Sequence, residues 1–209
     1  MNQLTQFSCA AFAQALASKA SVPGGGGAAA MAGALGTALC SMVGNFTAGK
    51  KKFAAVEADV QRMLSEGEAL RNRLMELVDA DALAFEPLSK AYSIPRDDPN
   101  RAQVMEDAAL NACQAPVEMV RCCAKALLLL EEMLEKGSKM LISDVGCGAL
   151  LCKAAMESAA LNVFVNTGAL KDRETVAKLE QEVDDTLRTY LPLADKITAS
   201  VTAYIRKEG

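Results

Sequence analysis

The side chains available for chemistry in this 209-residue chain include no histidine. Serine and cysteine nucleophiles that depend on a histidine base, and metals held by imidazole, are therefore excluded. Acid–base chemistry must then use Asp, Glu, Lys, Tyr, Cys or the backbone. Two aspartates have suggestive surroundings: Asp81 lies four residues before Phe85 in LVDADALAF, and Asp144 opens the stretch DVGCGALLC. They are the candidate catalytic residues.

Asp81 has the better setting for acid–base work. Residues four apart on a helix share a face, so Asp81 should lie beside Phe85, whereas Asp79, two residues earlier, points elsewhere. A carboxylate against apolar surface has a raised pKa and can exchange protons near neutral pH. The plainer alternative is that Asp79 and Asp81 are ordinary surface aspartates. For Asp144 it is that the carboxylate only stabilises the first turn of its helix.

A run of uncharged residues, Ala20 to Gly49, carries features that could bind an anion. Gly24 to Gly27 present bare backbone directly before an apolar helix, whose first N–H groups and dipole attract carboxylates or phosphates. Asn45 and Thr47 lie near the end of the run, and Lys50 follows it as the first of three lysines. The alternatives are a flexible turn for the glycines and a solvated surface for the lysines.

Two amides lie in another apolar stretch, LNVFVN, at Asn162 and Asn166. They are four residues apart and so face one way on a helix. Buried amides are costly unless they are paired. They are therefore predicted either to hydrogen-bond a neighbouring helix or to contact a ligand.

Two sequence motifs come close to known nucleotide sites but do not fit them. Gly44 to Lys50 reads G-x-x-x-x-G-K, yet Lys51 follows where a phosphate loop needs Ser or Thr, and a helix rather than a strand precedes it. Asp144 to Gly148, DVGCG, resembles the glycine turn of S-adenosylmethionine methyltransferases, but no alternating strands could build the required sheet. Nucleotide chemistry is not expected.

Composition indicates a globular protein without nucleic-acid or membrane partners. The net charge is −4, aromatic residues make up 4%, and the uncharged run is rich in Gly, Ala, Ser and Thr, as in a buried core helix. The seven cysteines are odd in number and lie among Ala, Leu and Met. They are predicted to be buried and reduced in a cytoplasmic protein, with no metal site.

The apolar periodicity predicts an all-α fold of about six helices in a single domain, residues 1–209, with no sustained alternation typical of strands. Ser8 and Ser143 are plausible N-caps, and bends are expected at the internal prolines. Two of the helices exceed the diameter of one ordinary domain and are therefore expected to extend into a partner subunit. Helices are predicted over residues 9–18, 28–46, 53–90, 101–136, 144–166 and 172–206.

Taken together, these residues resemble the cyclodeaminase/cyclohydrolase family of folate enzymes, which includes the C-terminal domain of formiminotransferase-cyclodeaminase. The resemblance spans almost the whole chain, in the order and spacing of the family. The chain departs from the family pattern by a fourth glycine in the glycine run and by cysteines at positions 40, 147 and 152. The matching segments are PGGGGAAAMAGALGTALCSMVGNFTAGKKKF (Pro23–Phe53), VDADALAF (Val78–Phe85) followed by Tyr92-Ser-Ile-Pro95, and SDVGCGALLCKAAMESAALNVFVN (Ser143–Asn166).

The resemblance implies a cytoplasmic, all-helical homodimer, with its site near the dimer interface, that acts on one-carbon tetrahydrofolate without a metal, a nucleotide or a tightly bound cofactor. Asp81 and Asp144 would supply the acid–base chemistry. Asn162 and Asn166 would orient the pterin, and Asp79 would lie near the substrate. Lys50 and the glycine backbone would hold the glutamate end of a substrate that could be polyglutamylated, with Asn45 and Thr47 beside it.

Two reactions belong to the family. In cyclodeamination, N10 of 5-formiminotetrahydrofolate attacks the formimino carbon and ammonia leaves, which gives 5,10-methenyltetrahydrofolate. In cyclohydrolysis, water opens that ring to 10-formyltetrahydrofolate. We favour cyclodeamination, in histidine degradation beside a separate formiminotransferase, and keep the cyclohydrolase as the alternative. A non-enzymatic alternative is an inactive helical folate-binding or dimerisation module.

Overall fold

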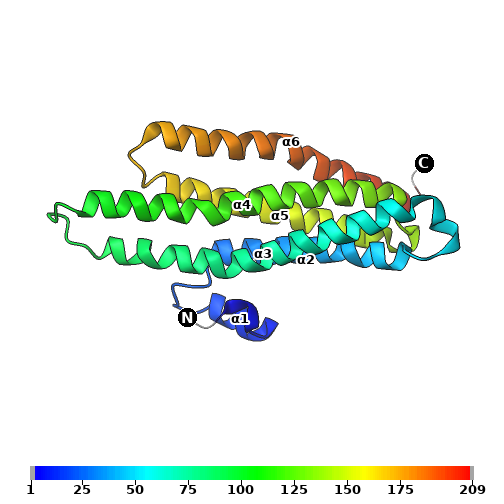
Figure 1. The fold of residues 1–209 in the computed structure, drawn as a ribbon, viewed down its shortest axis with the longest axis horizontal. Helices are drawn as coiled ribbons and strands as arrows, with labels where there is room; N and C mark the ends of the chain where they lie inside the picture. Colours follow the sequence, from blue (N-terminus) through cyan, green and yellow to red (C-terminus); the bar gives the residue numbers. More distant parts are fainter. Residues whose placement is uncertain (1–2, 208–209) are drawn as a thin grey trace.

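The computed structural model describes residues 3–207, and α-helices and short 3₁₀ helices are the regular elements of that part of the chain. Five long helices form an elongated bundle, and a short helix, α1, lies beside it near the N-terminus (Figure 1). This confirms the all-α fold of about six helices. The α-helices are α1 (Cys9–Leu16), α2 (Gly25–Thr47), α3 (Glu57–Tyr92), α4 (Arg101–Lys136), α5 (Ile142–Thr167) and α6 (Arg173–Arg206); the 3₁₀ helices are η1 (Leu4–Gln6), η2 (Lys51–Val56) and η3 (Lys139–Leu141).

Small residues let α2 and α5 approach closely at the centre of the bundle. A Cβ added at Gly36 would lie 2.8 Å from the carbonyl oxygen of Gly148 and 2.7 Å from Sγ of Cys152. A Cβ at Gly148 would in turn lie 3.0 Å from the carbonyl oxygen of Gly36. The backbones of the two helices are therefore in contact, which offsets the helix propensity that glycine costs, about 1 kcal/mol per residue.

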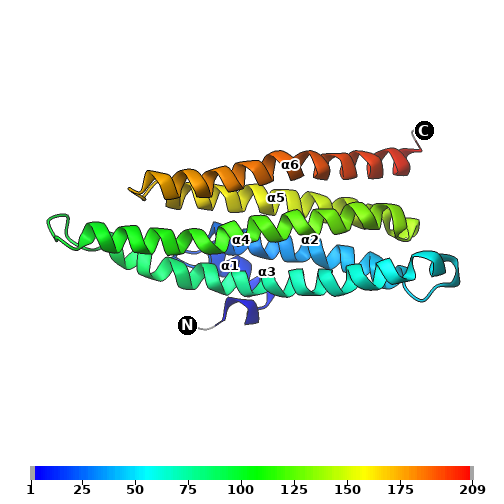
Figure 2. The same ribbon diagram turned by 45° about the horizontal axis from the view of Figure 1, so that its top comes forward.

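Helix α4 packs over α2 and α5 and fixes the order of the bundle. Helix α2 packs between α3 and α5, helix α5 packs between α2 and α6, and α4 contacts all four of these helices. The two views of the bundle show α4 along its whole length (Figure 2). The sides of α2 and α5 that face away from α4 are therefore left without a covering helix among the described residues.

Some expected boundaries differ from the structure. Helix α2 begins at Gly25 rather than at residue 28, so most of the predicted glycine loop forms a helical turn, with Gly24 as the N-cap. Helix α5 begins at Ile142, so Ser143 lies inside it and does not cap it. The caps at Ser8 and Asp172 are formed: Ser8 Oγ accepts the N–H of Ala11, and Asp172 accepts those of residues 174 and 175. Helices α3, α4 and α6 continue through Pro87, Pro116 and Pro192.

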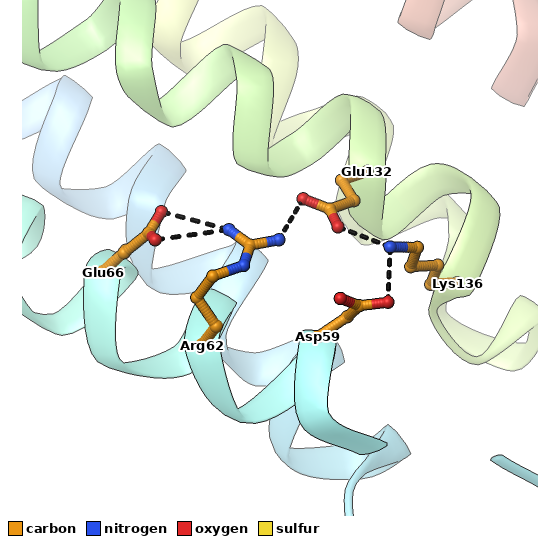
Figure 3. Close-up of polar contacts among 5 residues, drawn as sticks. All are labelled: Asp59, Arg62, Glu66, Glu132 and Lys136. Atoms are coloured by element: carbon orange, nitrogen blue, oxygen red, sulfur yellow. Dashed lines mark hydrogen bonds and ion pairs between the residues drawn. The ribbon is translucent and has the colours of Figure 1, made fainter. Parts of the chain in front are cut away.

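A chain of ion pairs joins α3 to α4 at the end of the bundle where α3 begins. Lys136 Nζ lies 2.6 Å from both Asp59 Oδ2 and Glu132 Oε1, and Arg62 Nη2 lies 2.5 Å from Glu132 Oε2 (Figure 3). Glu66 accepts from Arg62 at 3.3 Å. The ammonium group of Lys136 lowers the pKa of the Asp59 carboxyl. Such a network fixes the relative register of the two helices, although solvent screening keeps each pair weak.

A second, smaller cluster of buried residues closes the opposite end of the bundle. It joins the end of α3, the start of α4, the α5–α6 connection and the start of α6. This end is on the left of Figure 1, where the α3–α4 and α5–α6 connections lie. Its members are Leu88, Ala91, Ala108, Ala109, Ala112, Cys113, Leu170 and Val176.

Five of the seven cysteines are buried, and Cys9 and Cys147 are exposed, which corrects the expectation that all are buried. Burial raises the pKa of Cys40 and Cys152 to about 12. A thiol with so high a pKa stays protonated at neutral pH and is a poor nucleophile. The buried cysteines therefore act as small apolar core residues.

Candidate active site

The first turn of α2 meets a carboxylate from α3. A Cβ added at Gly26 would lie 2.3 Å from Asp81 Oδ1 and 2.5 Å from Oδ2, so the carboxylate occupies the space of the missing side chain. The backbone N–H of Gly27 donates a hydrogen bond to that carboxylate. No alanine fits at position 26 unless Asp81 moves. The glycine run thus places a bare helix N-terminus directly against Asp81.

Asp81 is the titratable group whose surroundings suit acid–base chemistry. Burial raises the pKa of its carboxyl from 3.8 to about 6, and the hydrogen bond from the Gly27 N–H opposes part of that rise. The dipole of α2 also favours the ionised form. A carboxyl with a pKa of about 6 is mostly ionised at neutral pH but accepts and returns a proton at low cost.

Asn162 of α5 completes a meeting point of three helices. A Cβ added at Gly25 would lie 3.5 Å from Asn162 Nδ2 and 3.6 Å from Oδ1, so the amide lies beside the same turn of α2. Asn162 Nδ2 donates to the carbonyl oxygen of Ser158 at 2.8 Å. This bond orients the amide and leaves Oδ1 as an acceptor for a ligand. The structure therefore brings Gly25–Gly27, Asp81 and Asn162 together, as a shared site requires.

Two other predicted contact residues hold the protein together instead. Asn166 Nδ2 donates to the carbonyl oxygen of Ala112 at 2.9 Å and so joins α5 to α4, which is the helix–helix alternative. Asp79 accepts the N–H of Leu4 at 2.6 Å and the hydroxyl of Thr5 at 2.7 Å. Both carboxylate oxygens of Asp79 thus anchor the N-terminal segment to α3. A substrate contact for Asp79 is not supported.

The remaining predicted residues lie at the far end of α2. Thr47 is fully buried; its Oγ1 donates to the carbonyl of Val43 at 2.7 Å and accepts the N–H of Ser138 at 2.9 Å. The prediction that Thr47 binds substrate is therefore corrected, because no solvent-side molecule reaches it. Asn45 is exposed, and Lys50 Nζ lies 5.8 Å above the ring of Phe46.

Asp144 also lies at that far end, in the first turn of α5, where it is half-buried. Asn162 follows it by 18 residues on the same helix, which corresponds to about 27 Å. Asp81 is next to the glycines that Asn162 touches, so Asp81 and Asp144 lie far apart. The prediction that both aspartates serve one site is therefore not met within a single chain.

One feature beside the site was missed from the sequence. A cavity of about 600 Å³ opens between the α3–α4 and α5–α6 connections, and three cations, Arg96, Arg101 and Lys171, line it. The available signal was the basic residues within and directly after the turn stretch Ser93–Asn100 (SIPRDDPN), and the one that follows Gly168. They are separated by about 70 positions, so the sequence alone did not suggest that they meet.

Comparisons with known proteins identify the family of the chain. The model of the formiminotransferase-cyclodeaminase family matches residues 8–185. The methenyltetrahydrofolate cyclohydrolase of Methylorubrum extorquens is 38% identical over 198 residues, which cover 93% of this chain and 95% of that protein. The formimidoyltransferase-cyclodeaminase of Sus scrofa is 30% identical over 181 residues, which cover 85% of this chain and 34% of that protein. This chain thus spans about a third of the length of the pig protein.

A solved structure has the same fold. The crystal structure of formiminotetrahydrofolate cyclodeaminase from Thermotoga maritima matches with a TM-score of 0.83 and 28% sequence identity, covering 94% of this chain and 98% of that one. The family match, the similar relatives and the shared fold lead to the same assignment. The chain belongs to the formiminotransferase-cyclodeaminase family.

Proposed function

We propose that this protein hydrolyses 5,10-methenyltetrahydrofolate to 10-formyltetrahydrofolate, with Asp81 as the acid–base residue. The observation that carries the proposal is the Asp81 carboxyl, whose pKa is raised to about 6 by burial against the first turn of α2. The cyclohydrolase is preferred over the cyclodeaminase that the sequence favoured, because the Methylorubrum extorquens relative is 38% identical along nearly its whole length. A one-carbon derivative of tetrahydrofolate is the proposed substrate, and the proposed reaction needs no tightly bound cofactor.

The reaction requires one group that accepts a proton and later returns it. As water adds to the methenyl carbon, the Asp81 carboxylate takes one of its protons and a tetrahedral carbon bearing OH forms between N5 and N10. Protonated Asp81 then gives that proton to N5 as the bond from carbon to N5 breaks. The hydroxyl proton is released to solvent as the formyl C=O forms. A carboxyl with a pKa near the working pH suits both steps. Asn162 Oδ1 would orient the pterin.

Cyclodeamination is the second candidate function, since it passes through the same carbon with NH₂ in place of OH. The 28% identical Thermotoga maritima structure is that of a formiminotetrahydrofolate cyclodeaminase. In that case the protein would act in histidine degradation and receive its substrate from a separate formiminotransferase. A cytoplasmic location is part of both proposals.

We further propose that the protein is a homodimer joined through the side of α2 and α5 that faces away from α4. Helices α2 and the segment 139–167 are apolar and long enough to cross a membrane, yet they are central helices of the bundle. Their outward side exposes large apolar side chains: Leu35 is 54% exposed, Leu161 65% and Val165 74%. No Asp, Glu, Lys or Arg lies on α2, and Glu157 is exposed among the apolar residues of α5. An exposed apolar surface of this extent is typical of a subunit interface.

An antiparallel two-fold arrangement on that face would rejoin the divided site. It would place the far end of one copy, with Asp144 and Lys50, beside the Asp81 end of its partner. In a two-fold dimer the same contact occurs twice, so two equivalent sites would form. The wide separation of Asp81 and Asp144 along one bundle motivates this arrangement, in which Asp144 of the partner copy would accept the hydroxyl proton, on its way to solvent, as the formyl C=O forms.

Two absorbance assays of the purified protein test the proposed function. Loss of the methenyltetrahydrofolate absorbance measures hydrolysis, and its appearance from 5-formiminotetrahydrofolate measures cyclodeamination. We expect a kcat/KM at least about 10-fold higher in the first assay, the equivalent of about 1.4 kcal/mol of transition-state stabilisation. A higher value in the second assay would establish the second candidate instead. No turnover in either assay, together with tight folate binding, would establish that the protein is an inactive binding module.

Replacing Gly26 with alanine should disable the site without unfolding the protein. The added Cβ would meet Asp81 Oδ1 at 2.3 Å, so the carboxylate must leave its place beside the Gly27 N–H. We expect kcat to fall by about 10- to 100-fold, since displacement of a catalytic group by about 1 Å costs that much. Thermal unfolding followed by circular dichroism should show one cooperative transition, because alanine is favourable in a helix. A kcat close to wild type would contradict the placement of Asp81.

A further inference from the structure

The cationic cavity at the end of the bundle has the properties of an anion receptor. Its walls come from the α3–α4 connection, the start of α4, the end of α5 and the α5–α6 connection. Arg96, Arg101 and Lys171 line it together with two acids, Asp98 and Glu106. The protein as a whole carries a net charge of −4, so this positive excess is local.

The two acids in the cavity are already bound to backbone N–H groups. Glu106 accepts the N–H of Lys171 at 2.8 Å and that of Asp172 at 2.9 Å, which lowers the pKa of its carboxyl. Asp98 Oδ1 accepts the N–H of Asn100 at 2.8 Å. These carboxylates therefore serve to shape the two connections, and the backbone N–H groups occupy part of their hydrogen-bonding capacity. Three cations against two acids leave the lining with an excess of one positive charge.

The cations, in contrast, keep most of their donors for a ligand. Arg96 forms no hydrogen bond or ion pair with any residue in 3–207. Arg101 uses Nε to bind the carbonyl oxygen of Ile94 at 3.0 Å, which fixes the guanidinium and leaves its outer nitrogens for a ligand. Lys171 Nζ makes no hydrogen bond among the described residues, and its charge acts on Glu106. A guanidinium group that is fixed through Nε and keeps its outer donors free, such as that of Arg101, is well suited to carboxylates.

The cavity adjoins the Asp81 site. Val165, which lines it, is one helical turn beyond Asn162 on α5, about 5 Å along the axis. Tyr92, which also lines it, is 11 residues beyond Asp81 on α3, about 16 Å along that axis. A ligand that reacts at Asp81 and carries its charged end beyond an aromatic spacer would therefore reach the cations.

We propose that this cavity binds the glutamate-tail carboxylates of the folate substrate, through Arg96, Arg101 and Lys171. The proposal rests on the proposed function, and it moves the tail away from Lys50 of the same chain, which lies at the other end of α2. The buried cluster formed by Leu88, Ala109 and Leu170 lies in the elements that carry the cavity and holds its walls in place. Further γ-linked glutamates add carboxylates, so longer tails should bind more tightly.

Steady-state kinetics with monoglutamate and triglutamate forms of methenyltetrahydrofolate test the proposal. Wild type should show a KM for the triglutamate at least about 10-fold lower. Arg96→Gln and Lys171→Gln should each raise that KM about 5-fold, consistent with one exposed charge-assisted contact, and leave kcat unchanged. Lys178→Gln is the matched control, because its ammonium group lies on α6 and pairs with Glu174. Equal KM values for the two substrates in wild type would overturn the proposal.

A binding measurement without turnover separates the two proposals. The probe is p-aminobenzoyl-triglutamate, which has the tail but no reactive carbon, titrated calorimetrically into wild type, the Arg96→Gln/Lys171→Gln double variant and the Lys178→Gln control. We expect wild type and the control to bind alike and the double variant about 10-fold or more weakly. If the probe binds in this expected pattern while neither folate assay shows turnover, the cavity proposal is supported and the proposed function is refuted. If turnover occurs but the double variant binds like the control, only the cavity proposal fails.

Discussion

Asp81→Asn should reduce kcat for methenyltetrahydrofolate by about 100-fold or more, with KM changed by less than about 3-fold, a typical loss for a general acid–base residue. Asparagine has nearly the shape of aspartate and can still accept the Gly27 N–H, so the first turn of α2 should keep its geometry. It cannot take a proton from water. The rate is measured by the loss of methenyl absorbance after subtraction of the uncatalysed hydrolysis.

The same substitution should not weaken the fold, and this distinguishes a catalytic role from a structural one. Burial raises the folded-state pKa of Asp81 from 3.8 to about 6. The folded protein then binds the proton more tightly than the unfolded chain, so stability falls as pH rises through that window. At neutral pH the buried, ionised carboxylate lowers the free energy of unfolding, and asparagine removes this destabilisation. Asp81→Asn should raise the free energy of unfolding at neutral pH by about 1–2 kcal/mol, with little gain near pH 4. A marked destabilisation at neutral pH would indicate a structural role.

Co-expression of two inactive variants should restore activity if each site combines residues from two chains. In an antiparallel dimer, Asp81→Asn in one chain and Asp144→Asn in the other place both changes in one site and leave the second site intact. A mixed dimer isolated with two different affinity tags should then have about half the activity of wild type, although each variant alone has about 1% or less.

A control pair with both changes at the same end of the bundle should restore nothing. In a mixed dimer of Asp81→Asn and Gly26→Ala, each site contains one of the two changes, so neither site is intact. Half-activity in the first pair, and in the second no more than the residual activity of the single variants, would establish the shared site. A mixed dimer of the first pair that stays inactive, an Asp144→Asn variant with normal turnover, or a protein that remains monomeric at micromolar concentration would each refute it.

The helices could be predicted well because their signals are local. Apolar residues recur at three- and four-residue spacing, and the predicted cap at Ser8 is formed, whereas the one at Ser143 is not. The start of α2 was misplaced because glycine has a low helix propensity and Gly25–Gly27 read as a loop. Tertiary contacts with Asp81, Val78 and Asn162 make that segment helical, and the sequence does not reveal those contacts.

The candidate site was predicted in part, for a similar reason. The chemistry of Asp81, the glycines and Asn162 was visible from residue type, and the structure brings them together. The prediction that Asp81 and Asp144 share one site assumed that they lie close together. Sequence spacing does not determine the distance between residues on different helices. Thr47 was assigned to the substrate because it is polar, but its hydroxyl bonds Val43 and Ser138 in the interior. A buried threonine and an exposed one look alike in a sequence.

The pH dependence of kcat for methenyltetrahydrofolate hydrolysis tests the central claim most directly, because it reports the protonation state of the group that does the chemistry. If the Asp81 carboxylate is the base, log kcat should rise by about one unit per pH unit below pH 6 and level off above it. Asp81→Asn should lose this dependence along with most of the rate. A wild-type kcat that stays flat from about pH 5 to about pH 8, or retention of the inflection in Asp81→Asn, would contradict the account.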